Sequence, residues 1–585
     1  MSRLEALRAQ MRAACLDALI VPTADPHLSE YVPEHWASRA WLTGFHGSAG
    51  QVVVTEKAAA LFTDSRYWIR AEEDLKGSSI ELIKSGAPGA PSVPAWLALH
   101  LAEGARVGLD PALCSIKHFG ELADSLLDVS LALVEAGDLF EKIWQDRPPR
   151  PMQPIKRLQG ASACTTEKLA ALRNALQKSG CQAFVSVSLD EIAWLLNLRG
   201  SDVDYNPVFL ANLIVLPEQV LLFTEASRVS PELIAELKLE GVEVRAPETF
   251  ISELDSLHVT VSVDPTRVTA ALAPHIRHLV EAPSEVTFMK SRKTDAELES
   301  IRKAMLTDGV ALVRFQMQLE AALAKHELLT EMRVAEMLHE QRQKDASFIG
   351  ESFETISAFG QNAALPHYTP SCEHDAELTQ GLLLVDSGAQ YVTGTTDITR
   401  MFAIGALSAE QRKGVTTVLK GHIALARAQV PVGTSGAQLD AYARAPLWQA
   451  GWDYGHGTGH GVGYILNVHE GPFHISPRST ATGRFGLAKG IVVSNEPGLY
   501  LAERWGVRIE NLMAAVEATH TEFGAFLKFE TLTLAPIDVR TIEPQLLSQE
   551  ERQWLNDYHR TVFERLSPLL NASERAWLSQ AVQPV

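Results

Sequence analysis

Cysteine is scarce in this sequence. Only five of the 585 residues are cysteines, and no two of them form a C-x-x-C pair. An odd number of widely spaced cysteines does not suggest a disulfide framework, and the spacing also disfavours a thiolate zinc site. The five are Cys15, Cys114, Cys164, Cys181 and Cys372. This usage indicates a reducing compartment.

Long hydrophobic runs are also missing. No stretch approaches the roughly 18 uncharged apolar residues that a membrane-spanning helix requires. The first residues, MSRLEALRAQMRAA, carry charges where a signal peptide has its apolar core, and Leu4, Leu7 and Met11 predict an amphipathic helix there. A transit peptide is the competing interpretation, which Glu5 and the lack of serine enrichment disfavour. We therefore expect a soluble, cytoplasmic protein.

Positive charge is limited as well. The chain has 52 Lys and Arg against 71 Asp and Glu, a net charge of −19, and no basic block is longer than Lys290–Lys293. Such a balance predicts neither a nucleic-acid partner nor binding to an anionic membrane. Hydrophobic residues at 46% and charged residues at 21% are typical of globular proteins, and the length predicts two to four domains.

A cluster of prolines marks the first expected domain boundary, near residue 150. The order ALIV, WL…GS and LFTD before it recurs after it as AFV, WL…GS and LFTE, with offsets between 153 and 165 residues. Such drifting offsets indicate two related α/β domains, 1–150 and 151–283, each a mixed sheet flanked by helices. Neither has a catalytic cluster, because Asp64, Asp190 and Glu191 are each typical of a cap or a solvated edge.

A third domain is predicted over 284–585. It opens with a capping box at Thr294–Glu297 and continues to about Pro536, after which Ser548 caps a further helix. That helix carries an apolar and aromatic stripe of Trp554, Leu555, Tyr558 and Val562. We expect the stripe to pack on the third domain; a subunit contact is the alternative.

Two aspartates in the third domain follow a pattern that predicts convergence. Asp386 ends the apolar run LLLVDSG, and Asp397 follows in GTTDITR. Across a hairpin with a two-residue turn, paired positions differ by an odd number and share a face of the sheet. With a turn near residues 388–390, both carboxylates are expected to point to the same place.

The segment GHGTGHGVG, residues 455–463, has glycine at every second position. An extended chain of this kind has one bare face, which other backbone or a substrate can approach closely. His456, Thr458 and His460 are then expected to project together from the other face. Standing alone, the segment would be typical of a glycine-rich turn with satisfied histidines.

Two glutamates complete the pattern. Glu496 follows the apolar run IVVSN, and Glu510 lies in GVRIEN. If these acids converge with Asp386 and Asp397, their charges require compensation, which two divalent cations supply. Oxygen-rich ligation with one imidazole suits Mn²⁺, and paired metals can deprotonate a bridging water and polarise a carbonyl. The pattern therefore predicts a metal-dependent hydrolase of amide bonds.

The chain resembles the Xaa-Pro aminopeptidases, pita-bread metallopeptidases, and is similar to their three-domain cytosolic type. The motifs that carry the resemblance run through nearly the whole chain: WLTGFHGSAG, FTDSRY, IAWLLNLRGSDVDYNPVF, ALPHYTP, GTTDITR, HGTGHGVGYILNVHEGP, SNEPGLY, VRIEN and FETLTLAPID. The resemblance implies an α/β (α+β) fold, with two creatinase-like N-terminal domains and a C-terminal pita-bread catalytic domain. It implies release of the N-terminal residue from peptides with proline second, and a homodimer.

The resemblance also implies residue roles. A metal-bridging hydroxide would attack the carbonyl before proline, with Glu496 handling its proton. His367 and His469 match histidines that contact the substrate and stabilise the intermediate, and His456 matches one near the proline pocket. Arg508 and Tyr500 match supporting residues in substrate binding. The two divalent ions, Mn²⁺ or alternatively Co²⁺ or Zn²⁺, would be held by Asp386, Asp397, His460, Glu496 and Glu510, of which Asp397 and Glu510 bridge both.

The departures from the family pattern are modest. They fall at Thr393, Met401 and Leu499, where the family often has an acid, a threonine and a tyrosine, and none is a ligand position. Glu530 also follows an apolar run, but the family pattern ends its carboxylates at Glu510.

Other functions fit less well. A prolidase-like dipeptidase would use the same metal set, but the doubled N-terminal domain favours the aminopeptidase. Creatinase-like enzymes and non-catalytic pita-bread binding proteins should have lost ligands that remain here. A serine hydrolase is disfavoured because neither Ser48 nor Ser435 lies in G-x-S-x-G.

Overall fold

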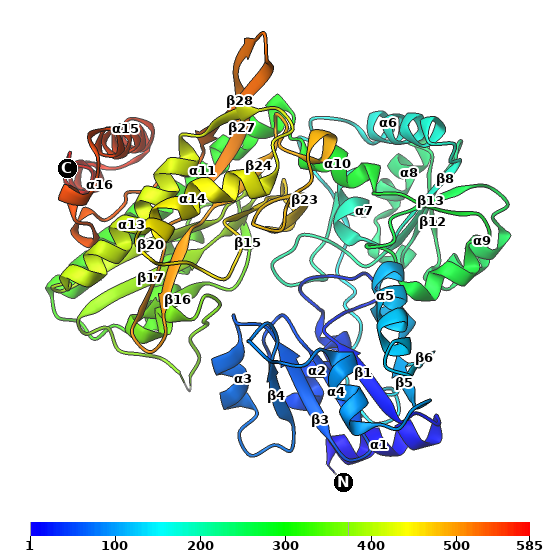
Figure 1. The fold of residues 1–585 in the computed structure, drawn as a ribbon. Helices are drawn as coiled ribbons and strands as arrows, with labels where there is room; N and C mark the ends of the chain where they lie inside the picture. The colour runs from blue at the N-terminus through cyan, green and yellow to red at the C-terminus, as the bar shows by residue number, and fades with distance from the viewer. Residues whose placement is uncertain (1, 373) are drawn as a thin grey trace. The chain divides into compact units, whose positions relative to one another are not determined.

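A computed structural model describes residues 2–372 and 374–585 of the chain (Figure 1). The chain divides into two compact units, Met1–Val286 and Thr287–Val585. Among the described residues, no helix has both the length and the apolar character needed to cross a bilayer.

The first unit begins with a six-stranded mixed sheet. Its first helix, α1, is amphipathic and carries the buried Leu4, Leu7 and Met11, as the sequence predicts. The helix begins with a capping box at Ser2. The strands, in sheet order, are β4 (Glu81–Lys84), β3 (Ala59–Thr63), β2 (Gln51–Thr55), β1 (Ala18–Pro22), β5 (Arg106–Leu109) and β6 (Ala132–Glu135). The helices are α1 (Arg3–Ala13), α2 (Ser38–Thr43), α3 (Trp68–Asp74), α4 (Val93–His100) and α5 (Ile116–Leu127).

A second six-stranded sheet in this unit repeats the same strand order. Its strands are β12 (Val242–Arg245), β11 (Val220–Phe223), β10 (Asn212–Val215), β8 (Ala183–Ser186), β13 (Val261–Val263) and β14 (Leu279–Glu281), with β7 (Lys156–Arg157) and β9 (Leu198–Arg199) forming a separate pair. The helices are α6 (Thr165–Lys178), α7 (Leu189–Leu195), α8 (Pro231–Leu239) and α9 (Phe250–Ser256). The shared order of the two sheets confirms that the repeated motifs belong to related α/β folds.

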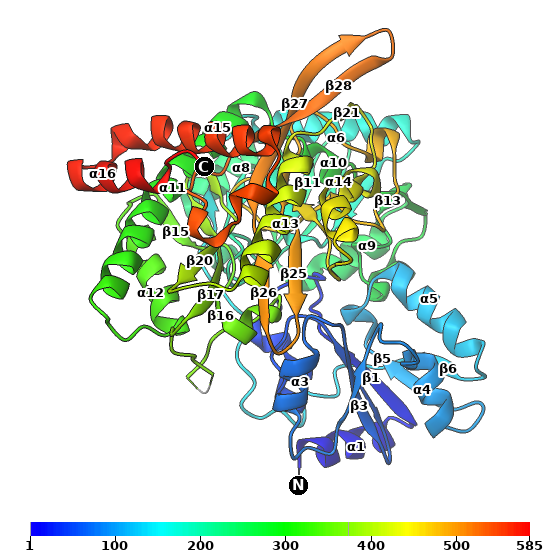
Figure 2. The ribbon, with the colours of Figure 1, turned by 60° about the vertical axis from the view of Figure 1, so that its left-hand side comes forward.

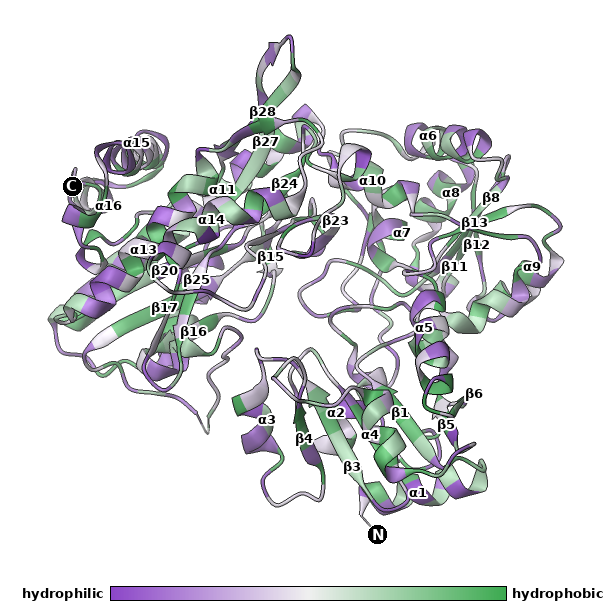
Figure 3. Cartoon of the chain, viewed as in Figure 1, coloured by the Kyte–Doolittle hydropathy of each residue, from purple (hydrophilic) through white to green (hydrophobic). Residues whose placement is uncertain are grey.

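The central strands of these sheets are buried on both faces. In β1, Leu19 and Val21 enter one apolar cluster, whereas Ala18 and Ile20 enter another on the opposite face. Strands β1 and β3 are accordingly apolar along most of their length (Figure 3). One expectation is wrong here: Glu191 is not at a solvated edge but is buried, where it accepts from Ser186 and pairs with Arg267.

The division between the two units falls within α10 (Glu285–Ser291), so the second unit begins inside this helix. Its strands form a three-stranded sheet of β16 (Ile356–Phe359), β17 (Gly381–Ser387) and β20 (Ile398–Ile404), and a six-stranded sheet of β21 (Gln429–Pro431), β28 (Gly524–Thr531), β27 (Asn511–Thr521), β24 (Val492–Asn495), β22 (Gly459–Gly461) and β23 (Glu470–Ile475). Smaller sheets are β15 (Phe348–Glu351), β18 (Ala389–Tyr391) and β19 (Gly394–Thr395), and β25 (Gly498–Leu501) with β26 (Trp505–Arg508).

The helices of this unit cover the sheets and form its core. They are α11 (Asp295–Ala324), α12 (Glu331–Arg342), α13 (Ala409–Ala426), α14 (Gly436–Gln449), α15 (Gln549–Leu566) and α16 (Ala572–Ala581). The capping boxes predicted at Thr294 and Ser548 are both present. Helices α15 and α16 contact α11, and both views of the ribbon show them beside it (Figures 1 and 2).

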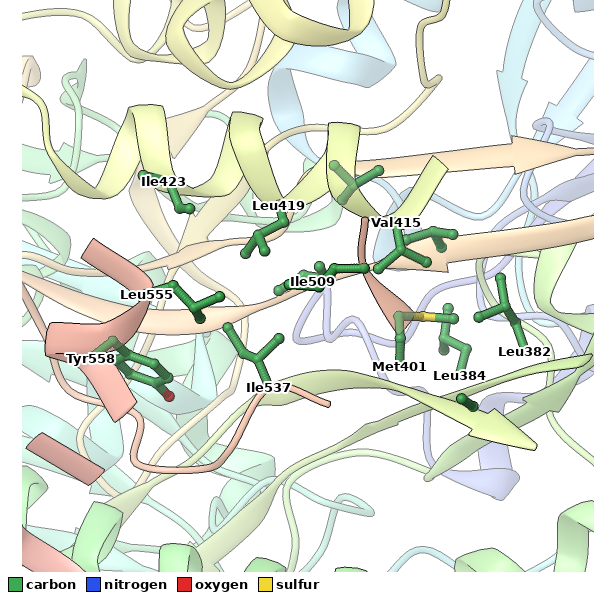
Figure 4. Close-up of a cluster of buried hydrophobic side chains, with 14 of the residues drawn as sticks. Leu382, Leu384, Met401, Val415, Leu419, Ile423, Ile509, Ile537, Leu555 and Tyr558 are labelled. Atoms are coloured by element: carbon green, nitrogen blue, oxygen red, sulfur yellow. The ribbon is translucent and has the colours of Figure 1, made fainter. Parts of the chain in front are cut away.

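The apolar face of α13 joins the strands to the C-terminal helix. Val415, Leu419 and Ile423 point from α13 towards Ile509, and Leu555 of α15 belongs to the same buried cluster (Figure 4). Spacing of three to four residues places such side chains on one helix face. The expectation that the C-terminal stripe packs on the third domain is therefore confirmed.

The hairpin that carries the two aspartates differs from the expectation in its turn. The predicted turn at residues 388–390 is wrong, because the chain continues as β18 and turns at Val392 and Thr393 instead. Gly388 is needed for close packing: a Cβ there would lie 2.1 Å from Ser352 Oγ and 2.2 Å from the Thr396 carbonyl oxygen. The outcome for the aspartates is unchanged, since Asp386 pairs with Thr399, two residues beyond Asp397.

Replacement of Gly388 by alanine tests this packing. We expect Gly388→Ala to lower the free energy of unfolding by about 1–3 kcal/mol, because the new methyl group must displace backbone. Denaturant unfolding measures the change. Gly350→Ala, on the neighbouring strand β15, is the matched control, since a Cβ there meets nothing within 4 Å. Equal midpoints for the two variants would contradict the packing argument.

Candidate metal centre

The five predicted metal ligands lie in or next to strands of the second unit, four of them at strand ends. Asp386 is near the end of β17, Asp397 precedes β20, and His460 is central in β22. Glu496 follows β24, and Glu510 precedes β27. Because β24 is antiparallel to both β22 and β27, with Asn495 opposite Asn511, these glutamates emerge at the same edge of the sheet.

A link between the two sheets brings the aspartates to that edge. The backbone amide of Glu510 donates to the carbonyl of Thr399 on β20 at 3.1 Å. His460 Nε2 then lies 3.5 Å from Asp397 Oδ2 and 3.4 Å from Glu496 Oε1. Ligand atoms of Asp397, His460 and Glu510 all lie within 4.8 Å of one another. The structure therefore brings residues from distant parts of the chain to one place.

The electrostatics of the cluster are those of crowded carboxylates. Burial and the neighbouring acids raise the pKa of Glu510 well above its ordinary value. Burial likewise raises the pKa of Asp386 to about 6, against the opposing effect of Arg508. Burial disfavours the charged form of His460, but Asp397 and Glu496 outweigh it and raise its pKa to about 9. The protein alone thus compensates these charges incompletely.

The donor set fits two divalent cations. Asp386 Oδ1 and Glu510 Oε1 are buried oxygens without a hydrogen-bond partner among the residues that the structure describes, which is costly for a carboxylate unless a cation occupies the vicinity. Hard carboxylate oxygens with one borderline imidazole are the ligands that Mn²⁺ and related ions take. The side chains of His460 and Glu496 are 13% and 17% exposed, so the cluster is open on their side.

The glycine-rich segment is extended only in its second half, which corrects the expectation of one continuous strand. Thr458 does not face the carboxylates, because its hydroxyl bonds to Tyr454 and to Asp440 of α14. The expected close approach is present: a Cβ at Gly459 would lie 2.0 Å from the Ser494 carbonyl oxygen, and one at Gly461 2.2 Å from that of Glu470. Close backbone packing therefore places His460 against Glu496.

His456 ends a hydrogen-bonded chain that starts at a metal-site carboxylate. Arg508 donates to Asp386 and, at 2.8 Å, to the Tyr500 hydroxyl, which lies 2.8 Å from His456 Nε2. Burial lowers the pKa of His456 to about 4, so that its ring is neutral and accepts from Tyr500 through Nε2. The three residues predicted for substrate binding thus form one connected group.

The two remaining histidines are held by their chain neighbours. Pro366 accepts from Arg508 at 3.3 Å, and the hydroxyl of Tyr368 donates to Glu331 at 2.6 Å, so the backbone is fixed on both sides of His367. His469 packs edge-on against His460 with ring centroids 4.3 Å apart. Its neighbour Glu470 is buried with Lys290 and Lys293. Both histidines are partly exposed.

Sequence reasoning missed two hydroxyl donors to the metal-site acids. Thr399 Oγ1 donates to Glu510 Oε2 at 2.8 Å, and Ser494 Oγ donates to Glu496 Oε1 at 3.0 Å. A hydroxyl residue two positions from a strand-end acid was the available signal. Glu530 is occupied elsewhere, since both of its oxygens accept from Arg302.

Comparison with known sequences identifies the family. Residues 299–517 match metallopeptidase family M24, and 525–585 match the C-terminal region of peptidase M24. Residues 3–143 and 146–297 each match a creatinase/prolidase N-terminal domain. The chain therefore belongs to metallopeptidase family M24, and the predicted combination of creatinase-like and pita-bread folds is confirmed.

Relatives that match nearly the whole chain are aminopeptidases within this family. Aminopeptidase P2 of Arabidopsis thaliana is 40% identical over 97% of this chain and 86% of its own. Xaa-Pro aminopeptidase ApepP of Drosophila melanogaster is 36% identical over 99% of this chain and 97% of its own. The crystal structure of X-prolyl aminopeptidase from Caenorhabditis elegans, described as a cytosolic enzyme with a di-nuclear active site, covers both chains fully with a TM-score of 0.94 and 34% identity. These matches confirm the predicted resemblance to Xaa-Pro aminopeptidases.

Removal of a central carboxylate tests the metal centre. We expect Asp397→Ala to reduce bound metal from two ions per chain, because its carboxylate lies between His460 and Glu510, and to abolish peptide hydrolysis. Metal analysis after dialysis and circular dichroism measure occupancy and folding. Glu530→Gln is the control, since Glu530 is bonded to Arg302 outside the cluster. Retained turnover in metal-loaded Asp397→Ala protein would disprove the mechanism.

Proposed function

We propose that this protein is an Xaa-Pro aminopeptidase, which releases the N-terminal residue from peptides with proline in the second position. The observation that carries the proposal is the cluster of Asp397, His460 and Glu510, with Glu496 beside His460 and Asp386 close enough to interact with the same acids, in a chain that matches such enzymes over its full length. All five ligand residues are present, which favours a catalytic metallo-exopeptidase over a non-catalytic pita-bread binding protein.

We assign both metal positions to this cluster. The residues that would hold the two divalent ions are Asp386, Asp397, His460, Glu496 and Glu510, and Asp397 and Glu510 would be the ones shared by both. Mn²⁺ suits the oxygen-rich set best, and Co²⁺ and Zn²⁺ are the alternatives. When bound, such a pair activates a water molecule and stabilises negative charge that develops on the substrate carbonyl oxygen.

Glu496 is placed to move the proton. Despite burial, the positive charge of His460 holds the pKa of the Glu496 carboxyl below the ordinary value, so that it is ionised and can accept a proton. Ser494 Oγ donates to its Oε1 at 3.0 Å and fixes its orientation. Since Glu496 is also partly exposed, it can pass the proton on to the leaving amine.

The histidines flank the position where substrate must lie. His367 and His469 are partly exposed and belong to segments that are held in place at their neighbouring residues. Their ring N–H groups can donate to the carbonyl oxygen as negative charge develops on it. His456, braced by Tyr500 and Arg508, supplies the ring at the proline side of the site.

Several further assignments belong to the same proposal. The chain acts on peptide substrates in the cytoplasm as a homodimer, with three domains at 1–150, 151–283 and 284–585. The cytosolic description of the Caenorhabditis elegans enzyme supports the compartment. A prolidase-like dipeptidase is the alternative activity, and the full-length matches to aminopeptidases disfavour it.

Substrate choice tests the proposed activity. We expect a tripeptide Xaa-Pro-Xaa to be cleaved after its first residue, and replacement of proline by alanine to lower kcat/KM at least about tenfold, because the ring would no longer fill its pocket. Chromatography of the released amino acid measures both rates. A prolidase would instead cleave only the dipeptide Xaa-Pro. Equal rates for the two tripeptides would reject the specificity.

Replacement of His367 tests its role in the reaction. We expect His367→Asn to lower kcat by about 10²-fold, with metal content unchanged, because a donor to the developing charge is removed. Steady-state kinetics at saturating metal provide the measurement. His326→Asn is the control, since His326 is exposed and has a positive φ of 56°, which asparagine tolerates. A kcat within twofold of the parent would rule the role out.

A further inference from the structure

A buried arginine lies directly behind the metal centre. Arg400 of β20 is 2% exposed, and its guanidinium donates to the carbonyl oxygens of Glu510, at 2.7 Å, and of Pro536 and Ala535, both at 3.0 Å. Among the residues that the structure describes, all of its hydrogen-bond acceptors are neutral oxygens. The guanidinium therefore fixes the backbone of a metal-site residue without pairing with its carboxylate.

Two asparagines connect this arginine to both glutamates. Asn495 precedes Glu496, Asn511 follows Glu510, and the two asparagines lie opposite each other on β24 and β27. Asn511 Oδ1 accepts from Arg400 at 2.8 Å. Because successive side chains in extended backbone point to opposite sides, the asparagines face away from the metal centre while the glutamates face into it.

His422 of α13 joins the two asparagines. Its Nδ1 lies 3.0 Å from the Asn495 carbonyl oxygen, and its Nε2 lies 3.1 Å from Asn511 Nδ2. Burial lowers the pKa of this ring to about 3, so that it is neutral, donates through Nδ1 and accepts from the Asn511 amide. Asn495 Nδ2 in turn donates to the His422 carbonyl at 2.9 Å. Every link therefore has a donor and an acceptor.

The C-terminal helix supplies the last member. The Tyr558 hydroxyl of α15 accepts from Arg400 at 2.8 Å and donates to the Ala535 carbonyl at 2.9 Å. Its ring lies in the cluster with Leu555 and Ile537 (Figure 4). A segment that contributes no metal ligand thus touches the residue that fixes the Glu510 backbone.

We propose that Arg400, His422, Asn495, Asn511 and Tyr558, here called the rear network, are positioning residues for Glu496 and Glu510, and that helix α15 is thereby a functional part of the metal centre. The network fixes the backbone beside both glutamates from behind, since its bonds end at the Glu510 and Asn495 carbonyls. Ligand carboxylates that are held in place by outer groups bind metal more tightly than ones that must be ordered on binding. The inference rests on the proposed two-metal site.

The test uses Tyr558→Phe in the full-length, Mn²⁺-loaded protein. The variant keeps the packed ring and removes only the hydroxyl. We expect the chelator concentration that releases half of the Mn²⁺ to fall about tenfold, measured as the Mn²⁺ that stays with the protein after gel filtration. The EPR spectrum of the two protein-bound Mn²⁺ ions should change, and added Mn²⁺ should restore most of kcat. A purely structural role would not produce these metal-specific effects.

Val562→Ala is the matched control. Val562 is fully buried on the same helix and belongs to the same apolar cluster, and its side chain has no polar group that could join the hydrogen bonds of the rear network. We expect this variant to unfold at lower denaturant concentration than the parent while its Mn²⁺ release remains unchanged. If it releases Mn²⁺ as readily as Tyr558→Phe, loosened packing explains the effect and the proposal is overturned.

A second variant covers the case in which Tyr558→Phe changes Mn²⁺ release too little to measure. Arg400→Lys keeps a cation but cannot reproduce the fork of hydrogen bonds, so we expect it to release Mn²⁺ more readily than Tyr558→Phe. Parental Mn²⁺ retention in both variants would refute the rear network. A parent protein that binds no Mn²⁺ pair would instead refute the proposed metal site, so the two failures are distinguishable.

Discussion

Mutual repulsion among buried carboxylates is the constraint on which this structure depends. Asp386, Asp397, Glu496 and Glu510 come from separate strands, and Arg508 and His460 offset their charge directly. Left without cations, such a cluster takes up protons, as the raised pKa values of Asp386 and Glu510 indicate. The surrounding fold must hold these groups together against that repulsion until metal ions replace the protons. The glycines of β22 and the link from β20 to Glu510 serve this purpose.

The same constraint accounts for the arrangement of groups around the cluster. On the substrate side, partly exposed histidines and Glu496 remain accessible, so that they can exchange protons and hydrogen bonds with a peptide. On the opposite side, the groups are buried, the Arg400 guanidinium donates to neutral oxygens, and backbone carbonyls are among the acceptors. A preorganised site needs both properties, since the reacting face must be reachable and its support must be rigid. Strands β24 and β27 separate the two environments.

Much of this could be predicted from the sequence because it depends on local patterns. Strand-end acids, alternating glycines and capping boxes depend on residues close in sequence, so their local structure can be predicted. The repeated motifs likewise predicted two related α/β folds, which have sheets of one topology. The position of the hairpin turn was not predicted, since Gly388 serves packing against Ser352 and Thr396, which are distant neighbours. Thr458 was also misplaced, because its partner Asp440 belongs to another helix. Arg400 and Tyr558 were missed as a pair for the same reason, since they lie 158 positions apart.

The scattering of the proposed ligands over residues 386 to 510 has a consequence for how the protein matures. In a zinc finger, neighbouring ligands let the ion itself organise a short peptide. Here the donors meet only after β17, β20, β22, β24 and β27 have paired across long loops, an event of high contact order. No nascent fragment that ends before Glu510 can assemble the site. Metal binding at the complete site must therefore follow the pairing of these strands.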